Sequence, residues 1–467
     1  MKKSRESIIF FSSLEWNTQR QVVHEYCEYL SKKHDKVLFI ENTGVRSLKL
    51  KDGRRLGKAI FNLFKLKNLF YKINENLTIF RPVYIPFFQY SKVMIFLNHL
   101  IIYFFLNNWI KFNKITSLSA VSFLPTPLVQ KLIQELRPNN LIYYCIDNLA
   151  VKSSNYKRFK EYEKQFFKIT DLTICTSKKL QKFASQNTNK FIYVPSGVDY
   201  KKLIETKNNL LISEKLFLDN LNGKIFGYVG AIRDIIDFEY IDKLSKKIDK
   251  SFFIFVGPIA LDYEPPSYIK QNPNIFFLGS KSHDQIASYI NRFDICMIPY
   301  IKNEFTDAIY PTKINEYLSL GKPIISTELD EINIFNKEHE NIINIIDFEK
   351  NINNQIENIL IDQKSETSML IAKNNDWSKR FEKIDNALAN SVVENKSLDW
   401  QIYFSNSIQK KLNKFLKLVS LLIILFFLIS SASFIKILSK PLIIVNKDYK
   451  PVDTLVVFSG YGNSNYY

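Results

Sequence analysis

Short apolar runs alternate with longer helix-period segments along most of this chain. In the first half these runs are rich in Ile, Val, Phe and Tyr, and they occupy residues 7–13, 36–42, 77–84, 117–124, 141–146, 171–177 and 191–197. Strands of this length that alternate with helices are typical of a parallel sheet covered by helices on both faces. The pattern therefore predicts an α/β fold.

The second half of the chain repeats this alternation. Its apolar runs occupy residues 224–231, 252–258, 274–280, 294–300, 323–327 and 341–345. Two successive sets predict two Rossmann-like domains, at residues 1–200 and 201–375. Because open α/β sheets bind ligands outside the carboxyl ends of their strands, we expect the functional site in the cleft between these domains.

Two stretches are more apolar than this alternation requires. Residues 418–435 carry no charge and are about as long as a minimal membrane span, so they predict one transmembrane helix after the basic linker 401–417. Residues 93–110 are also strongly apolar, but they contain Asn98, His99 and two further asparagines. Polar side chains are rare within a span, so we favour a helix packed on the first domain.

The charge balance predicts an anionic partner. The chain has 467 residues and a formal net charge of +18, which suits nucleic acid, anionic lipid or phosphorylated substrates. The sequence has no aromatic and basic RNA-binding motif and no zinc-finger spacing, so we do not expect nucleic acid. Residues 46–72 interleave Lys and Arg with Leu, Ile and Phe. This segment either lies on an anionic membrane surface or forms a solvated loop.

Cysteine and histidine usage gives no sign of a metal site. Cys27, Cys145, Cys175 and Cys296 are widely spaced, and we expect them to be small buried side chains in a reducing compartment. The five histidines form no metal-ligand cluster in the sequence. The first apolar run is too short for the core of a signal peptide, so we expect the first domain to stay in the cytosol.

The segment 310–327, YPTKINEYLSLGKPIIST, has the pattern of a capped helix followed by a strand. Pro311 suits the first helical turn, and Gly321 suits the left-handed position after the last turn. Lys313 and Glu316 are three residues apart and share one helix face. A lysine there suits a diphosphate, and a glutamate one turn deeper suits a ribose diol. A surface helix with an ordinary ion pair is the alternative.

This segment resembles the nucleotide-binding signature of GT-B glycosyltransferases of family four, in particular their teichuronic-acid and exopolysaccharide branch. Other segments resemble that branch in the same order. They are SLEWNTQRQVVHEYCEYL (13–30), LIYYCIDN (141–148), TICTSKKL (173–180), VPSGVD (194–199), GYVGAIRDIIDFE (227–239) and FFLGSKSHDQI (276–286). The resemblance covers about residues 7–390 and implies the GT-B fold.

The resemblance also gives an interpretation of the C-terminal region. Residues 376–400 resemble the return helix by which the GT-B chain packs back on its first domain. Residues 436–467 would follow the membrane helix as an extracytoplasmic tail. They resemble the opening of a SanA-like or ElyC-like envelope domain, and a short external tail is the alternative.

The resemblance implies a donor site on the second domain. Lys313 is the expected phosphate ligand, and Arg233 is a second candidate, although a solvated loop arginine is equally compatible with its place. Gly227 and Gly230 are expected to let the backbone approach the donor.

Glu316 matches the second glutamate of the family's paired-glutamate motif, whereas the first would fall at Ala308. Asn303, Glu304 and Thr306 instead resemble the N-E-x-T-x-A pattern of that branch, which implies that backbone amides around Thr306 hold the donor sugar. The missing glutamate leaves the expected retaining mechanism without its usual acidic pair.

The acceptor is expected on the first domain. Trp16, Asn17, Arg20 and His24 follow the first strand, where aromatic and polar groups suit a sugar. His24 also has a structural interpretation, because it falls one turn into a helix. Asp147 ends the strand run 141–146, where it would orient an acceptor hydroxyl or act as a base. A helix N-cap is the alternative role for this aspartate.

The residue pattern and the resemblance to family four together predict a membrane-anchored glycosyltransferase whose catalytic domains face the cytosol. It would move a sugar from a nucleotide-sugar donor to a lipid-linked or surface-polysaccharide acceptor, with catalysis by Lys313, Glu316 and Asp147 and with no metal or other cofactor. Two alternatives remain open: a catalytically inactive scaffold of a polysaccharide assembly, and a nucleotide-sugar epimerase.

Overall fold

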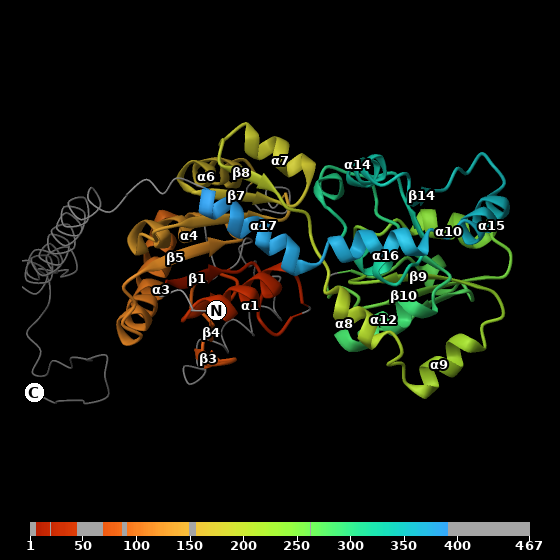
Figure 1. The fold of residues 1–467 in the computed structure, drawn as a ribbon, viewed down its shortest axis with the longest axis horizontal. Coiled ribbons are helices and arrows are strands. Elements are labelled where there is room, and N and C mark those ends of the chain that lie inside the picture. Colours follow the sequence, from red (N-terminus) through yellow and green to blue (C-terminus); the bar gives the residue numbers. More distant parts are fainter. Residues whose placement is uncertain are drawn as a thin grey trace, which may run out of the picture. The chain divides into compact units, whose positions relative to one another are not determined.

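The computed structural model describes residues 6–18, 20–43, 69–85, 91–148, 156–261 and 263–390. These residues form two sheets, each covered by helices, one after the other along the chain (Figure 1). The α/β prediction is therefore confirmed. The predicted membrane helix, the linker before it, the tail after it and most of the basic segment 46–72 lie outside the described residues.

The N-terminal sheet has the order β3-β4-β2-β1-β5-β6-β7-β8. All its described pairs are parallel except β3 with β4. The sequence pattern missed the short β3, which lies at the edge of the sheet. The strands are β1 (Ser7–Phe11), β2 (Val37–Ile40), β3 (Phe70–Lys72), β4 (Leu77–Phe80), β5 (Leu118–Ser122), β6 (Leu141–Cys145), β7 (Leu172–Cys175) and β8 (Phe191–Tyr193).

Helices pack on both faces of this sheet, and aromatic residues fill much of the space between. Phe10 of β1 stacks on Phe39 and Phe123, with ring centroids 6.3 and 6.1 Å apart. Cys27, Cys145 and Cys175 are buried in this domain as free thiols, as the sequence predicted. The helices are α1 (Val22–Lys33), α3 (Lys92–Phe112), α4 (Pro127–Leu136), α6 (Tyr156–Ile169) and α7 (Lys178–Ser185).

The C-terminal sheet is parallel throughout its described pairs, with the order β11-β10-β9-β12-β13-β14. Its strands are β9 (Lys224–Val229), β10 (Ser251–Val256), β11 (Ile275–Phe277), β12 (Ile295–Ile298), β13 (Ile324–Ser326) and β14 (Ile343–Ile345). The loops after β9 and β12 emerge side by side, because these strands are neighbours and run in the same direction.

The second domain and its exit contain the remaining helices. They are α8 (Tyr200–Thr206), α9 (Ile212–Asp219), α10 (Phe238–Lys247), α11 (Ser267–Lys270), α12 (His283–Arg292), the 3-10 turn η2 (Thr306–Ala308), α13 (Lys313–Ser319), α14 (Asp330–Glu338), α15 (Ile352–Ile361), α16 (Ser365–Asn374) and α17 (Trp377–Asn390).

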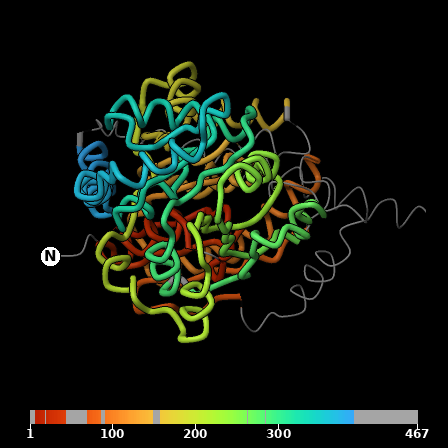
Figure 2. Tube along the Cα trace, turned by 90° about the vertical axis from the view of Figure 1, so that its right-hand side faces the viewer, coloured from red at the N-terminus to blue at the C-terminus, as the bar shows by residue number. Residues whose placement is uncertain are grey.

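The chain crosses between the two sheets twice, and the two crossings are joined by backbone hydrogen bonds. Val198 N–H donates to Asn375 O at 3.1 Å, and Trp377 N–H donates to Val198 O at 3.0 Å. A side chain at Gly197 would collide with the Trp377 ring, so a glycine is required at this close approach. After the second crossing, α17 lies against α1 of the first domain (Figures 1 and 2).

Candidate active site

Lys313 lies at the carboxyl edge of the C-terminal sheet, over the turn that follows β9. Gly230 in that turn has a φ of +138°, and a Cβ atom there would lie 2.7 Å from Lys313 Nζ. Only a glycine allows both this backbone conformation and the close approach of the lysine. The Lys313 amine lies 5.2 Å from the ring centroid of Tyr228 and 5.7 Å from that of Tyr300.

These neighbours favour a charged amine at Lys313. Burial acts to lower the pKa of Lys313, but Tyr228, Tyr300 and Glu316 outweigh it and raise the pKa above its usual range. Glu316, one turn further along α13, is half-buried and close enough to contribute to this shift. The structure thus brings together the two side chains that the sequence motif selected.

Helix α13 begins later than the sequence pattern predicted. Thr312 is the N-cap residue and Lys313 the first helical residue, so Pro311 precedes the helix instead of lying in its first turn. Gly321 follows the last turn with a φ of +64°, as the pattern predicted. The shift places Lys313 beside the Gly230 turn, at the very start of the helix.

Arg233 lies in the loop that follows the Gly230 turn. Its guanidinium carbon is 5.8 Å from the Phe305 ring centroid, and its Nε lies 3.6 Å from Asp234 Oδ1. The backbone ties the two loops together, since Ile301 N–H donates to Ile235 O at 2.8 Å. One edge of the sheet therefore presents two cationic side chains, Lys313 and Arg233, from adjacent elements.

Gly227 has a packing role. It lies within β9, and a Cβ atom there would come within 1.9 Å of the Phe293 ring. We expected a donor to approach the backbone at Gly227, but the Phe293 ring fills the space beside this glycine. Gly230 is the glycine of this pair whose freedom serves the candidate site.

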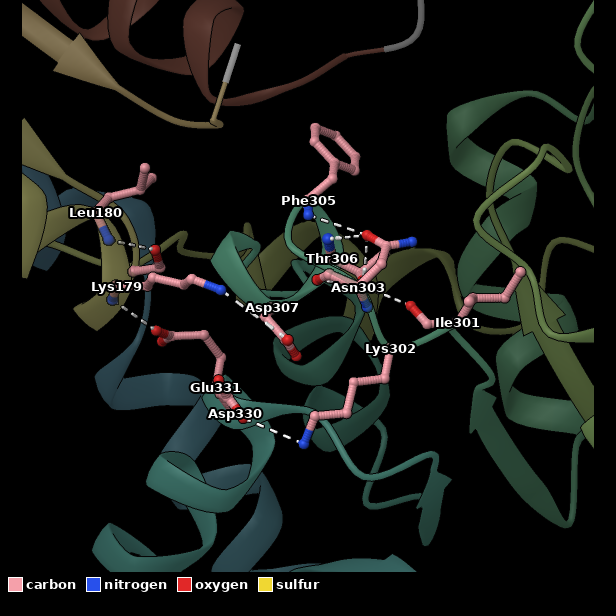
Figure 3. A network of polar contacts seen from close by, with 11 residues as sticks. Lys179, Leu180, Ile301, Lys302, Asn303, Phe305, Thr306, Asp307, Asp330 and Glu331 are labelled. Atoms are coloured by element: carbon pink, nitrogen blue, oxygen red, sulfur yellow. Dashed lines mark hydrogen bonds and ion pairs between the residues drawn. The ribbon is translucent and has the colours of Figure 1, made fainter. Parts of the chain in front are cut away.

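The loop at Asn303 also differs from the expectation. Asn303 Oδ1 accepts hydrogen bonds from Phe305 N–H and Thr306 N–H, both at 3.0 Å (Figure 3). Thr306 is fully buried, and its hydroxyl donates to Ile301 O. The amides expected to hold a donor sugar are thus used inside their own loop, and Asn303 and Thr306 shape that loop. Glu304 lies on its exposed part.

On the N-terminal domain, Trp16 packs inward beside Phe39 and His24, with ring centroids 5.0 and 5.4 Å away. Its backbone N–H donates to Glu41 Oε1 at 3.1 Å, which fixes the loop after β1. Asn17 is exposed next to it. Glu41 was not singled out from the sequence, although it directly follows the strand run of β2, where polar residues gather in parallel sheets.

Arg20 and His24 are engaged within the first domain. Arg20 forms ion pairs with Glu25 and Glu28 of α1, both at 2.8 Å. His24 is buried, its Nδ1 accepts from Gln21 N–H at 3.1 Å, and its Nε2 lies 3.2 Å from Glu15 O. Burial lowers the pKa of His24. These contacts correct the expectation that Arg20 and His24 face an acceptor: both side chains stabilise the start of α1.

Asp147 follows β6 by two residues and is half-buried at the carboxyl edge of the N-terminal sheet. Residues 149–155, just after it, lie outside the described part of the chain, so the alternative role of a helix N-cap stays a prediction. The place of Asp147 agrees with the predicted position at the strand ends, which is where acceptor chemistry was expected.

A polar network that was not predicted from the sequence joins the two domains at the start of α7. Glu331 Oε1 accepts from Lys178 N–H at 2.7 Å. It also accepts from Lys179 N–H at 3.2 Å, at the start of α7 (Figure 3). Lys179 Nζ points at Asp307, 4.0 Å from its Oδ2. Burial raises the pKa of Glu331 to about 7.

Asn315 is a further residue that was not singled out from the sequence. It is fully buried on α13, its Nδ2 donates to Ser196 O at 2.7 Å, and its Oδ1 accepts from Asn375 Nδ2 at 2.8 Å. Asn315 therefore fixes the helix of Lys313 to both chain crossings. The sequence could have indicated Asn315, because it lies between Lys313 and Glu316 in the motif and falls on another face of the helix.

The second domain is similar in sequence to known glycosyl transferases. Residues 223–362 match the family model described as glycosyl transferases group 1. This range contains the Gly230 turn, Arg233, the Asn303 loop and α13.

A longer likeness comes from TuaH of Bacillus subtilis (strain 168), which is named for teichuronic acid biosynthesis as a glycosyltransferase. It is 25% identical over 205 residues, which make up 41% of this chain and 51% of TuaH. The match thus spans about half of the length of this relative.

Solved structures show the fold. Sucrose-phosphate synthase from Thermosynechococcus elongatus superposes with a TM-score of 0.59 at 12% identity, over 83% of this chain and 98% of that one. HepE from Anabaena, in complex with UDP-glucose, gives 0.54 at 13% identity, over 82% and 99%. The fold is GT-B. The predicted pair of Rossmann-like domains is therefore confirmed.

Metal ligands do not gather at this site. Among the residues that the structure describes, no group of three or more His, Cys, Asp or Glu side chains is placed to hold a metal ion. The cations at this edge of the second sheet include Lys313 and Arg233, and carboxylates accompany both, Glu316 beside Lys313 and Asp234 beside Arg233.

Proposed function

We propose that this chain is a glycosyltransferase that takes a sugar from a nucleotide-sugar donor. The observation that carries the proposal is the close approach of Lys313 to the Gly230 turn, at the carboxyl edge of a sheet that matches group 1 glycosyl transferases. A diphosphate leaving group gains negative charge as the glycosidic bond breaks. Fixed cations at that point stabilise the transition state without reorganising.

The donor in this proposal is a uridine diphosphate sugar. HepE, which has the same fold, is described in complexes with UDP and with UDP-glucose. Lys313 and Arg233 would bind the diphosphate, and Glu316 would accept hydrogen bonds from the ribose diol. These cations would serve in place of a metal ion, and transfer would retain the anomeric configuration, as the resemblance to family four implies.

The acceptor in this proposal is a lipid-linked or surface polysaccharide. Its support is the likeness to TuaH, whose name refers to teichuronic acid biosynthesis. Asp147, at the carboxyl edge of the N-terminal sheet, would orient the acceptor hydroxyl or accept its proton. Trp16 and Asn17, in the loop after β1, would contact the acceptor sugar.

We also propose that the chain is anchored in the cytoplasmic membrane through residues 418–435, with both Rossmann-like domains in the cytosol. The uncharged sequence of this segment is the support. A reporter fused after Tyr467 should then report the outer side of the membrane. A cytosolic signal from that reporter would exclude a single span.

The second candidate function is a catalytically inactive scaffold. Its specific support is Ala308, which stands where a first acidic residue was expected and is buried within the hydrophobic core of the N-terminal domain. No carboxylate is available from this position. An inactive relative would bind the nucleotide sugar without releasing the nucleotide.

A transfer assay separates these functions. The purified full chain in detergent would be incubated with UDP-sugars and a membrane lipid extract as acceptor, and the release of UDP would be measured. An active enzyme releases UDP only when donor and extract are both present. A chain that binds UDP-glucose but releases no UDP with any extract would support the scaffold.

A further inference from the structure

Helix α3 (Lys92–Phe112) packs on the N-terminal domain through one of its faces. Ile102, Leu106 and Trp109 are buried in the domain core, together with α4 and the sheet. Asn98, also on this face, exchanges two hydrogen bonds with the backbone of Ile85, at 2.6 and 2.9 Å. This face therefore cannot turn toward another partner without breaking the core.

The opposite face of α3 is apolar although it is exposed. Val93 is 61% exposed, Leu100 48% and Phe104 62%, and Phe96 and Leu97 lie between them. Residues spaced by three, four and seven positions share one stripe of a helix. A surface helix of a soluble domain carries polar residues at such positions, so this stripe requires an explanation.

Basic residues lie at both ends of the stripe and beside it. The sequence contains no Asp or Glu between Glu75 and Glu135. Lys92 and Lys111 lie at the two ends of the helix, and Lys111 falls five turns after Val93 on the same stripe. On α4, Lys131 Nζ lies 4.8 Å from the Phe96 ring centroid. An apolar stripe with a cationic rim is complementary to an anionic bilayer surface.

We propose that the outer face of α3 docks on an anionic lipid bilayer, with the helix axis in the plane of the headgroups. Val93, Phe96, Leu97, Leu100 and Phe104 would enter the boundary of the acyl chains. The lysines at the helix ends would remain at the phosphates. The proposal concerns the membrane side of the first domain and holds whether or not the chain transfers a sugar.

The helix lies in the membrane plane because only one side of it can meet lipid. By length and composition, α3 is the one described helix that could cross a membrane. Its length of about 32 Å would suffice. However, lipid would have to surround a spanning helix, and the inner face of α3 is occupied by the core of its own domain.

Lipid quenching of labels attached to α3 tests this proposal. The four native cysteines are buried, so a maleimide fluorophore would report on an introduced cysteine. Phe104→Cys and Leu100→Cys would be compared with Ile361→Cys, an apolar residue of α15 in the second domain that is 80% exposed. The full chain would be reconstituted in phosphatidylcholine–phosphatidylglycerol vesicles that contain spin-labelled lipid. Circular dichroism would check the fold of each variant.

We expect quenching of the labels at residues 104 and 100 to be at least about threefold stronger than at residue 361. Replacing phosphatidylglycerol by phosphatidylcholine should weaken this difference, since the cationic rim then loses its partner. Equal quenching at the three positions would overturn the proposal. Failure of the label to react at residue 104 in detergent would also overturn it, because another protein surface would then cover the face.

Discussion

At the scale of single residues, the close approach of Lys313 to Gly230 accounts for the presence of a glycine in the turn after β9. The amine occupies the space that any side chain at Gly230 would fill, so the turn and the helix position one another before any donor binds. A cation held in this way stabilises developing charge without the cost of moving into place.

Replacing Lys313 by Ala should lower kcat/KM for transfer by roughly 100- to 1000-fold, the scale of one preorganised group that stabilises the transition state. Steady-state kinetics of UDP release would measure the change. Lys337→Ala, on the exposed side of α14, is the matched control, because it removes the same charge from the same domain. Similar losses in both variants would assign the effect to net charge alone.

Glu163 provides a second test on one residue, independent of activity. Its carboxylate accepts a hydrogen bond from Tyr143 O–H at 2.7 Å, and burial raises its pKa from 4.5 to about 7. The buried carboxyl is therefore favoured in its protonated form. Its contribution to stability is full below pH 4.5 and is lost as the pH rises through 7.

Between pH 5 and pH 8, Glu163 should remove about 2–3 kcal/mol from the free energy of unfolding of the N-terminal domain. Glu163→Gln should make this pH dependence flatter, since glutamine does not titrate and still accepts from Tyr143. Urea unfolding followed by fluorescence at several pH values would measure both. Parallel curves for the variant and the wild type would contradict the assigned pKa.

At the scale of elements, the two domains are held together by the chain crossings, by α17 and by the contact between α7 and α14. Glu331 of α14 accepts two N–H groups at the start of α7, which lies in the other domain. The first N–H groups of a helix have no partner within it, so this carboxylate completes α7.

Glu331→Ala should leave these two N–H groups unsatisfied and weaken the domain contact by about 1–3 kcal/mol. Glu331→Gln should preserve it in large part, because its amide oxygen still accepts. Limited proteolysis at the crossing around Val198 would report the loosening. If alanine and glutamine behave alike, the hydrogen bonds to α7 do not hold the domains together.

Helix α17 offers a separate test of domain docking. Phe381 is buried against Tyr26 and Tyr29 of α1, with ring centroids 5.0 and 4.9 Å away. Phe381→Ala should cost about 3–5 kcal/mol of unfolding free energy, as expected for a buried aromatic side chain. Glu382→Ala, one residue along on the exposed side, should have little effect. Thermal unfolding by calorimetry compares the two variants.

The order of strands and helices could be predicted from the sequence, because apolar runs of strand length alternate with helical spacing throughout both domains. The exact start of α13 and the edge strand β3 could not. The spacing of apolar positions does not resolve the first residue of a helix, and β3 is only three residues long and half-exposed.

Some residues of the candidate site could also be predicted from the sequence, and others could not. Lys313 and Glu316 lie close together in sequence, so a local motif revealed them. Glu331 and Asn315 act through backbone groups more than 100 residues away, and no local pattern records such partners. For Asn303, Thr306, Arg20 and His24, the sequence located the segments but not the hydrogen bonds and ion pairs that these side chains form.

At the scale of the whole molecule, charge and apolar surface are distributed unevenly. The chain has a net charge of +18. The first domain contains a stretch without any acidic residue, between Glu75 and Glu135, and α3 exposes its apolar stripe there. The second domain carries the cations of the candidate donor site. Under the two proposals above, the second domain would bind a nucleotide sugar and the first would approach a membrane.

The most direct test of the central claim is a calorimetric titration of the purified full chain with UDP-glucose and other nucleotide sugars. We expect saturable binding of at least one UDP-sugar by the wild type and by Lys337→Ala. Lys313→Ala should bind it at least about tenfold more weakly, the loss of about 1.4 kcal/mol. Equal affinity of the wild type and Lys313→Ala for every nucleotide sugar that binds would contradict the account, because the donor would then lie elsewhere.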